Sequence, residues 1–464
     1  MSDDDLTMKL DELATRHDVP GAAVGLMRMG GRPDDDELLT AAYGVTNVET
    51  VVEVTDDTVF QIGSISKVFT TTLIMQLVDR GAVDLDALVA EVVPGLKLST
   101  EVGMRSITVR QLLCHISGID GDVFTDFGRG DDCVERYVAA LDTVPQIFTP
   151  GRMFSYSNSA FALAGRVVEV LTEQGWEQVL RERVLEPLAL GHTSTLPEEA
   201  LLHRVAVGHQ GKFGEPRTRT DRWQIPRSLG PAGLINSTVA DVLTFAGCHL
   251  RDGLHGDVRL LSAASARQMR HRQTDQPVGM QIAGHQGLGW MCDEWDGVEV
   301  YGHSGATIGQ YAYLQVFPEQ RIALCLLTNG PGAANLWAEL RREVLAGEGI
   351  NAPLSVCPGP DGRSGHDQDL DRWVGTYGST AENIVVEHED GGLQVTISET
   401  DLGFDPEGDP EVLHLRPLGD DRFAYQPEGS VPWGAASFGT LSTDQGEGNR
   451  DYLQLGLRLI RRTA

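Results

Sequence analysis

Ser64 and Lys67 have the types and the spacing that nucleophilic catalysis needs. They form an S-x-x-K motif, and residues three apart on a helix lie on the same face. A serine hydroxyl beside an amine that accepts its proton can attack a carbonyl carbon and form an acyl-serine. Residues 58–63 predict a strand end and a turn, and residues 68–78 predict a buried helix. Ser64 would then lie at a helix N-terminus, where free N–H groups stabilise an oxyanion.

A structural role is the alternative for Ser64, because serine is a favoured helix N-cap and short motifs match by chance. The chain contains few lysines, however, at Lys9, Lys67, Lys97 and Lys212, so a chance pairing is less frequent here. Lys67 also lies in a largely apolar segment, and burial favours the neutral amine that can accept a proton. The pattern therefore favours a nucleophile and its base.

A second motif, Tyr156-x-Asn158, suits the same chemistry. On an extended segment these two residues face the same side. Tyr156 could hold or relay the serine proton, while Asn158 could position Lys67 and a substrate amide by hydrogen bonds. Taken alone, the motif is short, and a packing role for the tyrosine in a turn would be the better interpretation. The motif gains its meaning from following an S-x-x-K.

A third motif, His303-x-Gly305, lies between two short apolar segments. A glycine at 305 lets a ligand backbone approach closely. The Ala306 N–H could join the Ser64 N–H as an oxyanion hole. A single histidine is more often a structural hydrogen-bonding residue than a catalytic one, but the order of the three motifs favours a role for His303 in the site.

Composition indicates a globular chain of two or three domains, with 464 residues and 41% hydrophobic content. The net charge is −30, from 37 basic and 67 acidic residues, so we expect no binding to nucleic acid. One segment is locally basic despite this negative charge. It is a loop that could bind an anionic group or simply face solvent, and it contains Arg217, Arg219, Arg222 and Arg227.

The N-terminal residues and the cysteines predict a cytoplasmic protein. Residues 1–5 have no positive region followed by an apolar run, and no segment is apolar for long enough to cross a bilayer. We therefore expect neither secretion nor membrane association. The six scattered cysteines contain no C-x-x-C pair, which fits reduced thiols better than disulfides or a zinc site. No metal or organic cofactor is implied.

The element pattern predicts an α/β sandwich for residues 1–350, with a sheet built from both ends of that domain and a helical subdomain between them. Residues 351–368 are rich in proline and glycine, which is typical of a linker. Residues 369–464 show short alternating segments separated by turn clusters, and this spacing predicts a small antiparallel β-barrel.

The three motifs in this order resemble those of the penicillin-binding-protein and class C β-lactamase superfamily, across residues 6–350. Segments 112–119 and 230–238 add to the resemblance. It implies a β-lactamase/transpeptidase-like fold and a lipocalin-like barrel. It implies that Ser64 is the nucleophile, that Lys67 and Tyr156 share the base and acid work, and that Ser64 and Ala306 N–H groups bind the oxyanion. By the same resemblance, Gly233 and Gly305 contribute to substrate binding.

The sequence departs from β-lactamases of this type at His303, where they usually have lysine. Histidine is mostly neutral at cytoplasmic pH, so a permanent charge for a substrate carboxylate is missing, which disfavours a β-lactamase as a further alternative. The His-x-Gly variant with a C-terminal barrel is similar to D-aminopeptidases, carboxylesterases and the penicillin-binding-protein-type thioesterases that release nonribosomal peptides as macrocycles. In the last group the barrel contributes an arginine that receives a carboxylate. Arg458 is the candidate here, although it could equally project from a terminal strand.

These features lead to a specific hypothesis and two alternatives. The first is a thioesterase that macrocyclises a peptidyl thioester with a D-residue at its acyl end, with a peptidyl carrier protein as a partner. The second is a hydrolase of small esters or D-configured amides, which would use the same residues. The third, which the intact motifs disfavour, is a binding protein that has lost its chemistry.

Overall fold

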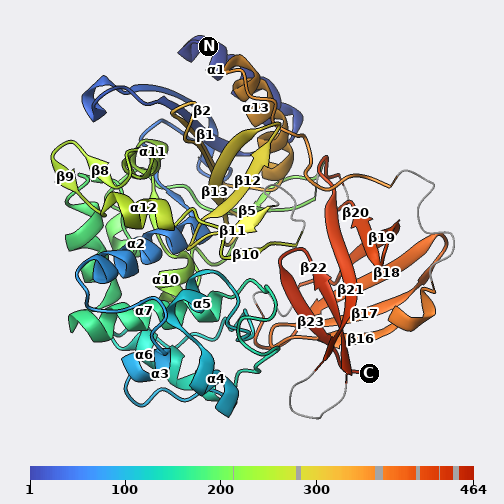
Figure 1. The fold of residues 1–464 in the computed structure, drawn as a ribbon. Helices are drawn as coiled ribbons and strands as arrows, with labels where there is room; N and C mark the ends of the chain where they lie inside the picture. The colour runs from blue at the N-terminus through green and yellow to red at the C-terminus, as the bar shows by residue number, and fades with distance from the viewer. Residues whose placement is uncertain (213, 278–283, 361–368, 404–407, 428, 443–448) are drawn as a thin grey trace.

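The structure, a computed structural model, describes residues 1–212, 214–277, 284–360, 369–403, 408–427, 429–442 and 449–464. Its larger part is built on a nine-stranded antiparallel sheet (Figure 1). Strand β1 pairs with both β15 and β2, so the two ends of this part meet inside the sheet. The strands in spatial order are β10 (Thr274–Asp275), β11 (His285–Gln286), β12 (Met291–Trp295), β13 (Val298–Ala306), β14 (Tyr311–Phe317), β15 (Ile322–Thr328), β1 (Gly21–Arg28), β2 (Glu37–Asn47) and β3 (Val52–Glu53).

Both faces of the sheet centre are buried, because apolar residues occupy successive positions of β1 and β15. Successive side chains of a strand point to opposite faces. Ala22 and Val24 of β1 pack on the face covered by α1 (Asp3–Arg16) and α13 (Ala333–Gly347), whereas Ala23 packs on the opposite, helix-rich face. The sequence-based prediction of an α/β sandwich with strands from both ends is confirmed.

The opposite face carries the helical part of the chain, with α2 almost entirely buried at its centre. Helices α7, α10 and α11 pack around α2 and the sheet. The helices are α2 (Ser66–Asp79), α3 (Val89–Val92), α4 (Glu101–Ser106), α5 (Val109–Leu113), α6 (Cys133–Ala139), α7 (Asn158–Thr172), α8 (Trp176–Leu180), α9 (Pro197–Ala200), α10 (Gly230–Gly233), α11 (Val239–Leu250) and α12 (Ala263–Gln268). Short strand pairs connect them: β4 (Phe60–Gln61) with β7 (Asn236–Ser237), β5 (His209–Gln210) with β6 (Thr218–Arg219), and β8 (Leu254–His255) with β9 (Val258–Arg259).

The C-terminal part forms a closed antiparallel barrel of eight strands, as the sequence predicts. Its interior is apolar and contains several aromatic rings, with Trp373 stacked on Phe438 and Tyr377 packed against the same ring. The strands are β16 (Gly375–Gly378), β17 (Glu382–Glu389), β18 (Gly392–Glu399), β19 (Glu411–Gly419), β20 (Arg422–Tyr425), β21 (Gly434–Ser442), β22 (Asn449–Leu455) and β23 (Arg458–Arg462). The domain boundaries stay predictions, and residues 361–368 of the predicted linker lie outside the described residues.

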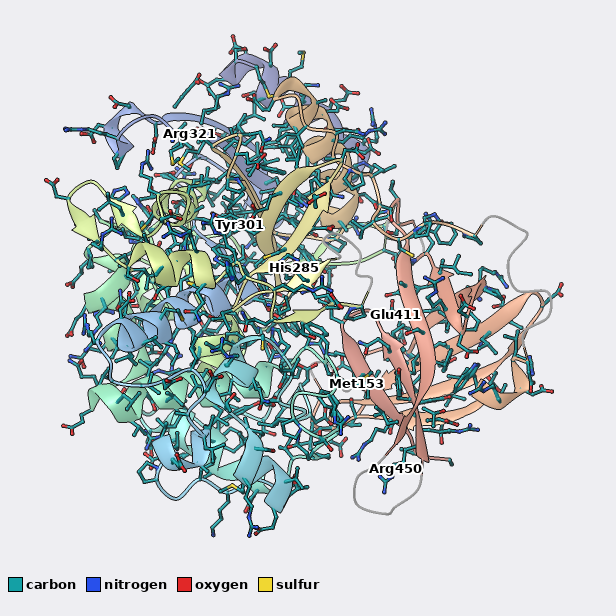
Figure 2. All side chains as sticks on the ribbon, in the orientation of Figure 1. Met153, His285, Tyr301, Arg321, Glu411 and Arg450 are labelled. Carbon is teal, nitrogen blue, oxygen red and sulfur yellow. The ribbon has the colours of Figure 1, made fainter. Side chains whose placement is uncertain are left out.

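The barrel packs against the loop that precedes α7. Figure 2 shows Met153 between the helical part and the barrel strands, where it joins an apolar cluster with Phe148 and Leu459. The Leu459 N–H donates to Ser155 Oγ at 3.1 Å. This contact matters for the site, because the same loop continues directly into Tyr156.

Candidate active site

Ser64 lies in a short 3-10 turn, Gly63–Ile65, that leads directly into α2. The N-cap of α2 is Ile65, which makes no side-chain capping bond, so the capping alternative for Ser64 is wrong. Ser64 is half-buried and lines a cavity of about 450 Å³. Its hydroxyl is therefore accessible to a ligand while its backbone is fixed by the helix.

Lys67 is fully buried on the first turn of α2 and contacts Ser64. Its Nζ lies 3.1 Å from Ser64 Oγ, 2.7 Å from Asn158 Oδ1 and 2.7 Å from the Ala232 carbonyl oxygen. Burial, followed by the nearby Arg458 charge, lowers the pKa of Lys67 well below its usual value of 10.5, and Asp122 opposes this shift. The arrangement favours a neutral amine aimed at the Ser64 hydroxyl.

Tyr156 approaches Ser64 from the loop before α7. Its hydroxyl is hydrogen-bonded with Ser64, and Lys67 Nζ lies 4.8 Å from the centre of its ring. Burial raises the pKa of Tyr156, while the Ser64 hydrogen bond acts in the opposite direction. Tyr156 is thus a neutral phenol that can pass a proton to or from Ser64. Behind it lies His115, stacked on the phenol ring with 4.2 Å between centroids.

Asn158 is the first residue of α7, which corrects the extended segment expected for residues 156–158. The bend occurs because the Ser157 side chain caps the helix by accepting the Ala160 N–H at 3.0 Å. Asn158 nevertheless lies in the same cavity as Tyr156. Its Oδ1 accepts from Lys67, and its Nδ2 donates to Asp122 Oδ1 at 2.5 Å.

The end of β13 lies against the turn that contains Ser64, because glycines face each other there. A Cβ on Gly305 would lie 2.8 Å from the Ser64 nitrogen and 2.0 Å from the Ile62 carbonyl oxygen. Gly63 has a φ of +49°, and a Cβ there would lie 2.7 Å from the Ala306 nitrogen. The backbone segments that carry Ser64 and Ala306 are therefore in close contact, which the two glycines allow. Both Ser64 and Ala306 line the same cavity.

Replacing Gly305 by Ala should reduce serine acylation by a factor of about 100, because the new methyl group must push β13 away from the Ser64 turn. The rate of thiol release from an activated thioester measures this effect. Gly175→Ala is the matched control, since a Cβ at 175 would meet no atom within 4 Å. Equal rates for the two variants would contradict this reading of the glycine contact.

His303 lies in the cavity as a neutral side chain. Its Nδ1 is 2.5 Å from the Ser304 carbonyl oxygen, so Nδ1 carries the proton and Nε2 is the acceptor. Among the described residues, Nε2 has no hydrogen-bond partner. Burial, then the nearby Lys67, lowers the pKa of His303 to about 3. This agrees with the prediction that the site lacks a permanent charge at this position.

Arg458 enters the same cavity from the barrel. It begins β23 after a two-residue turn at Gly456 and Leu457, and Leu457 packs against Tyr156. The Tyr156 N–H donates to the Leu457 carbonyl at 2.8 Å, which fixes the turn. The Arg458 side chain is 35% exposed, pairs with Asp122 through Nε, and lies 5.2 Å from the Tyr156 ring centre.

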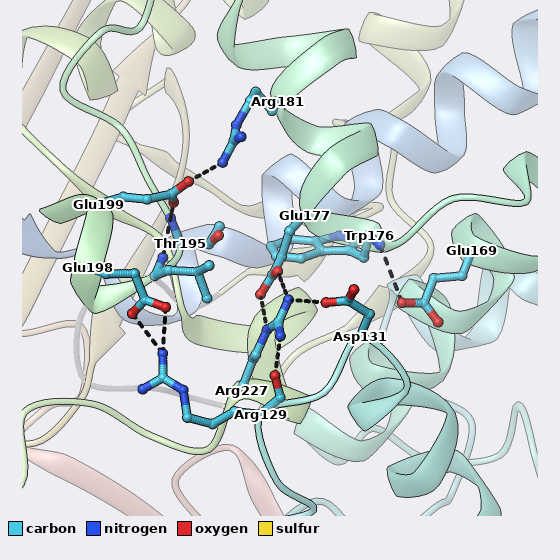
Figure 3. Close-up of polar contacts among 11 residues, drawn as sticks. Arg129, Asp131, Glu169, Trp176, Glu177, Arg181, Thr195, Glu198, Glu199 and Arg227 are labelled. Carbon is cyan, nitrogen blue, oxygen red and sulfur yellow. Dashed lines mark hydrogen bonds and ion pairs between the residues drawn. The ribbon is translucent and has the colours of Figure 1, made fainter.

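Gly233 and the loop before it cover another side of the cavity. Ile225 and Leu229 line it together with Gly233. Arg227 anchors this loop: its Nε donates to Glu177 at 2.9 Å, and its guanidinium also pairs with Asp131 at 3.0 Å (Figure 3). Arg227 thus has a structural role within the chain, which neither interpretation of the arginine loop included.

The structure thus brings every predicted site residue together around one cavity, apart from Lys67, which lies directly beneath it. The predicted residues lining the cavity are Ser64, Tyr156, Asn158, Gly233, His303, Gly305, Ala306 and Arg458. The sequence did not reveal Asp122, His115 or Leu457. His115 lies in a segment that carried the family resemblance, which was the available signal for it.

The described residues contain no group of three or more histidine, cysteine or acidic side chains that could hold a metal ion. Within the same residues, no helix has the length and apolar character to cross a membrane. The six cysteines are buried free thiols in the structure. Burial raises the pKa of Cys114 to about 12, so this thiol is not a competing nucleophile near neutral pH.

Comparison with known proteins gives the family. The model of the Beta-lactamase family matches residues 6–347. Penicillin-binding protein 4 of Amycolatopsis lactamdurans is 43% identical over 374 residues, which cover 80% of this chain and 96% of that protein. The family model therefore spans the three motifs, and the relative is matched over nearly all of its length.

Solved structures agree with this result. The crystal structure of SurE has 28% sequence identity, a TM-score of 0.77 and 99% coverage of both chains. A D-stereospecific amidohydrolase from Streptomyces sp. has 28% identity and a TM-score of 0.58, with 74% of this chain and 98% of its own covered. The chain belongs to the Beta-lactamase family, in the superfamily of the penicillin-binding proteins, and is a serine hydrolase or acyltransferase.

Proposed function

We propose that this protein releases a peptidyl thioester as a macrocycle through an acyl-Ser64 intermediate, with a D-residue at the acyl end of the peptide. The observation that carries this proposal is Arg458, a barrel residue that lines the same cavity as Ser64. A charged binding group in the same cavity as the nucleophile suits a second reactant. Simple hydrolysis needs only water at that place.

In the proposed reaction, Ser64 Oγ attacks the thioester carbonyl while Lys67 accepts the hydroxyl proton. Its Nζ is placed for this at 3.1 Å. The N–H groups of Ser64 and Ala306 stabilise the tetrahedral oxyanion. The carbon–sulfur bond then breaks, and the leaving thiolate takes a proton from the Lys67 and Tyr156 pair. This step leaves an ester between the peptide and Ser64.

In the second half of the reaction, the peptide's own amine attacks the acyl-Ser64 carbonyl. Lys67 accepts the amine proton, directly or relayed through the Tyr156 hydroxyl, the ester bond breaks, and the Ser64 oxygen takes back a proton from Lys67. The product is a lactam, and no water is consumed. Arg458 would hold the carbonyl or carboxylate group next to the attacking amine through charge-assisted hydrogen bonds.

Similar proteins support the stereochemical part of the proposal. SurE was solved with D-Leu, and that structure matches 99% of this chain at 27% identity with a TM-score of 0.74. The match includes the barrel that contributes Arg458. A peptidyl carrier protein is the donor we propose for the thioester, and a cytoplasmic location, as the sequence predicts, would suit that donor.

The competing function is hydrolysis of an ester or a D-configured amide. The 28% identity to a D-stereospecific amidohydrolase favours it, but that protein covers only 74% of this chain. A non-catalytic binding protein is disfavoured, because the Ser64, Lys67 and Tyr156 side chains are in mutual contact.

Product analysis separates the two enzymatic functions. A short peptidyl thioester ending in a D-residue is incubated with the enzyme, and the products are identified by mass spectrometry. The L-epimer and the Ser64→Ala variant are the controls. We expect the cyclic peptide from the D-substrate alone. Linear acid as the only product would exclude cyclisation and establish a hydrolase.

Arg458→Lys should separate the two half-reactions. The ammonium keeps a positive charge beside Asp122 but loses the planar fork that binds a carboxylate. We expect aminolysis of the acyl-enzyme by a free amino acid to fall by a factor of about 10 to 100, with an acylation rate close to that of the unmodified enzyme. An unchanged aminolysis rate would remove Arg458 from the proposed mechanism.

A further inference from the structure

Asp122 is a buried carboxylate that contacts both halves of the proposed site. It lies in the segment between α5 and α6 and is 8% exposed. Its Oδ1 accepts from Asn158 Nδ2 at 2.5 Å. Its Oδ2 pairs with Arg458 Nε. Asp122 thus contacts Asn158 of α7 through one oxygen and Arg458 of the barrel through the other, and Asn158 in turn contacts Lys67.

The contact with Asn158 determines how that amide is oriented. Because a carboxylate accepts hydrogen bonds only, Nδ2 of Asn158 must face Asp122. Oδ1 then faces Lys67, where it accepts from Nζ at 2.7 Å. A flipped amide would place two donors together at Lys67 and two acceptors together at Asp122. Asp122 therefore holds Asn158 in the orientation that positions Lys67.

The contact with Arg458 determines which guanidinium atoms remain for a ligand. Asp122 engages Nε, and the terminal nitrogens supply the other N–H donors of the planar group. Arg458 also lies over the Tyr156 ring, with Cζ 5.2 Å from its centre. The guanidinium is thus fixed on two sides while it borders the cavity.

We propose that Asp122 is a positioning residue that sets Asn158 for acylation and Arg458 for binding the attacking nucleophile, so that one carboxylate aligns the two half-reactions. This inference rests on the proposed function. It adds that the barrel is aligned with the Ser64 site by a residue that contacts no reacting atom. Loss of Asp122 should therefore impair both half-reactions together.

Asp120 offers a matched control two residues away. It is also buried, and its Oδ2 accepts from the Thr380 N–H at 2.7 Å and from Thr380 Oγ1 at 2.8 Å. Asp120 thus joins the same segment to the same barrel without contacting Asn158 or Arg458 in the described contacts. Its replacement removes a barrel contact but leaves the proposed alignment in place.

The test compares Asp122→Ala with Asp120→Ala in the full chain. Acylation is followed as thiol release from a D-residue thioester. Nucleophile selection is followed as the ratio of aminolysis by D-leucine to aminolysis by D-leucinamide, which lacks the carboxylate. For Asp122→Ala we expect acylation to slow by a factor of about 10 or more and the ratio to fall by a similar factor. For Asp120→Ala we expect both to stay within a factor of about two, whatever the loss of thermal stability.

Equal behaviour of the two variants would overturn the inference, and so would an effect of Asp122→Ala on only one half-reaction. If Asp122→Ala does not fold, Asp122→Asn replaces it, because this isostere keeps a single acceptor and must lose at least one of the two contacts. A folded Asp122→Asn enzyme with both properties unchanged would also overturn it. Failure of the unmodified enzyme to form an acyl-enzyme would instead refute the proposed function.

Discussion

Ser64→Ala should abolish acyl-enzyme formation, with a loss of about 10⁴-fold or more in the rate of thiol release. The hydroxyl is the atom that forms the covalent bond, and Lys67 and Tyr156 act only through it. Residual turnover would then come from the oxyanion hole and substrate binding alone. The rate is measured with a D-residue thioester under conditions that saturate the unmodified enzyme.

Ser66→Ala is the matched control for this result. Ser66 is buried two residues away, and its Oγ accepts the Ile235 N–H at 3.1 Å. Removing that hydroxyl should lower the stability by about 1 kcal/mol and leave acylation intact. A Ser66→Ala enzyme as inactive as Ser64→Ala would mean that the turn before α2, rather than the Ser64 hydroxyl, limits the reaction.

Lys67→Met should slow acylation by a factor of about 10³, because the apolar side chain cannot accept the Ser64 proton. Methionine has a similar length and suits a fully buried position. The Asn158 and Ala232 oxygens lose their donor in this variant, so thermal unfolding must be measured in parallel. A folded Lys67→Met enzyme with an unchanged acylation rate would exclude Lys67 as the base.

Lys67 as the base also leads to an expected pH dependence for the unmodified enzyme. A base acts in its neutral form, so acylation should rise with pH through the lowered pKa of Lys67 and then level off. Because burial holds that pKa well below 10.5, the rise should lie well below pH 10.5. The pKa of His303, at about 3, keeps that ring neutral throughout this range. Activity that begins to rise only near pH 10.5 would contradict a lowered pKa for Lys67 as the base.

Sequence could predict the local parts of the site because their chemistry is encoded in short spacings. Ser64 and Lys67 are three residues apart at the start of a helix, so their 3.1 Å contact follows from helix geometry. At Gly305 the sequence predicted close approach of a ligand backbone, whereas in the structure the Ser64 turn of the chain itself lies against this glycine. Local rules suffice for such features.

The long-range parts could not be predicted in this way. Asp122 and Arg458 are 336 residues apart, and nothing in either segment indicates their ion pair. Their contact depends on how the β22–β23 turn docks beside Tyr156, which is a property of the assembled fold. Arg227 is a similar case, because its ion pair with Glu177 also depends on the assembled fold. The sequence alone was compatible with an arginine that faces solvent.

The most direct test of Ser64 as the nucleophile is to trap the acyl-enzyme and locate the adduct. The protein is mixed with a slowly released D-residue thioester, quenched in acid, digested, and mapped by mass spectrometry. The proposed mechanism predicts one acyl group per chain, on Ser64 in the peptide that contains the S-x-x-K motif. An adduct on any other residue, or no covalent adduct under conditions where the thioester is consumed, would contradict it.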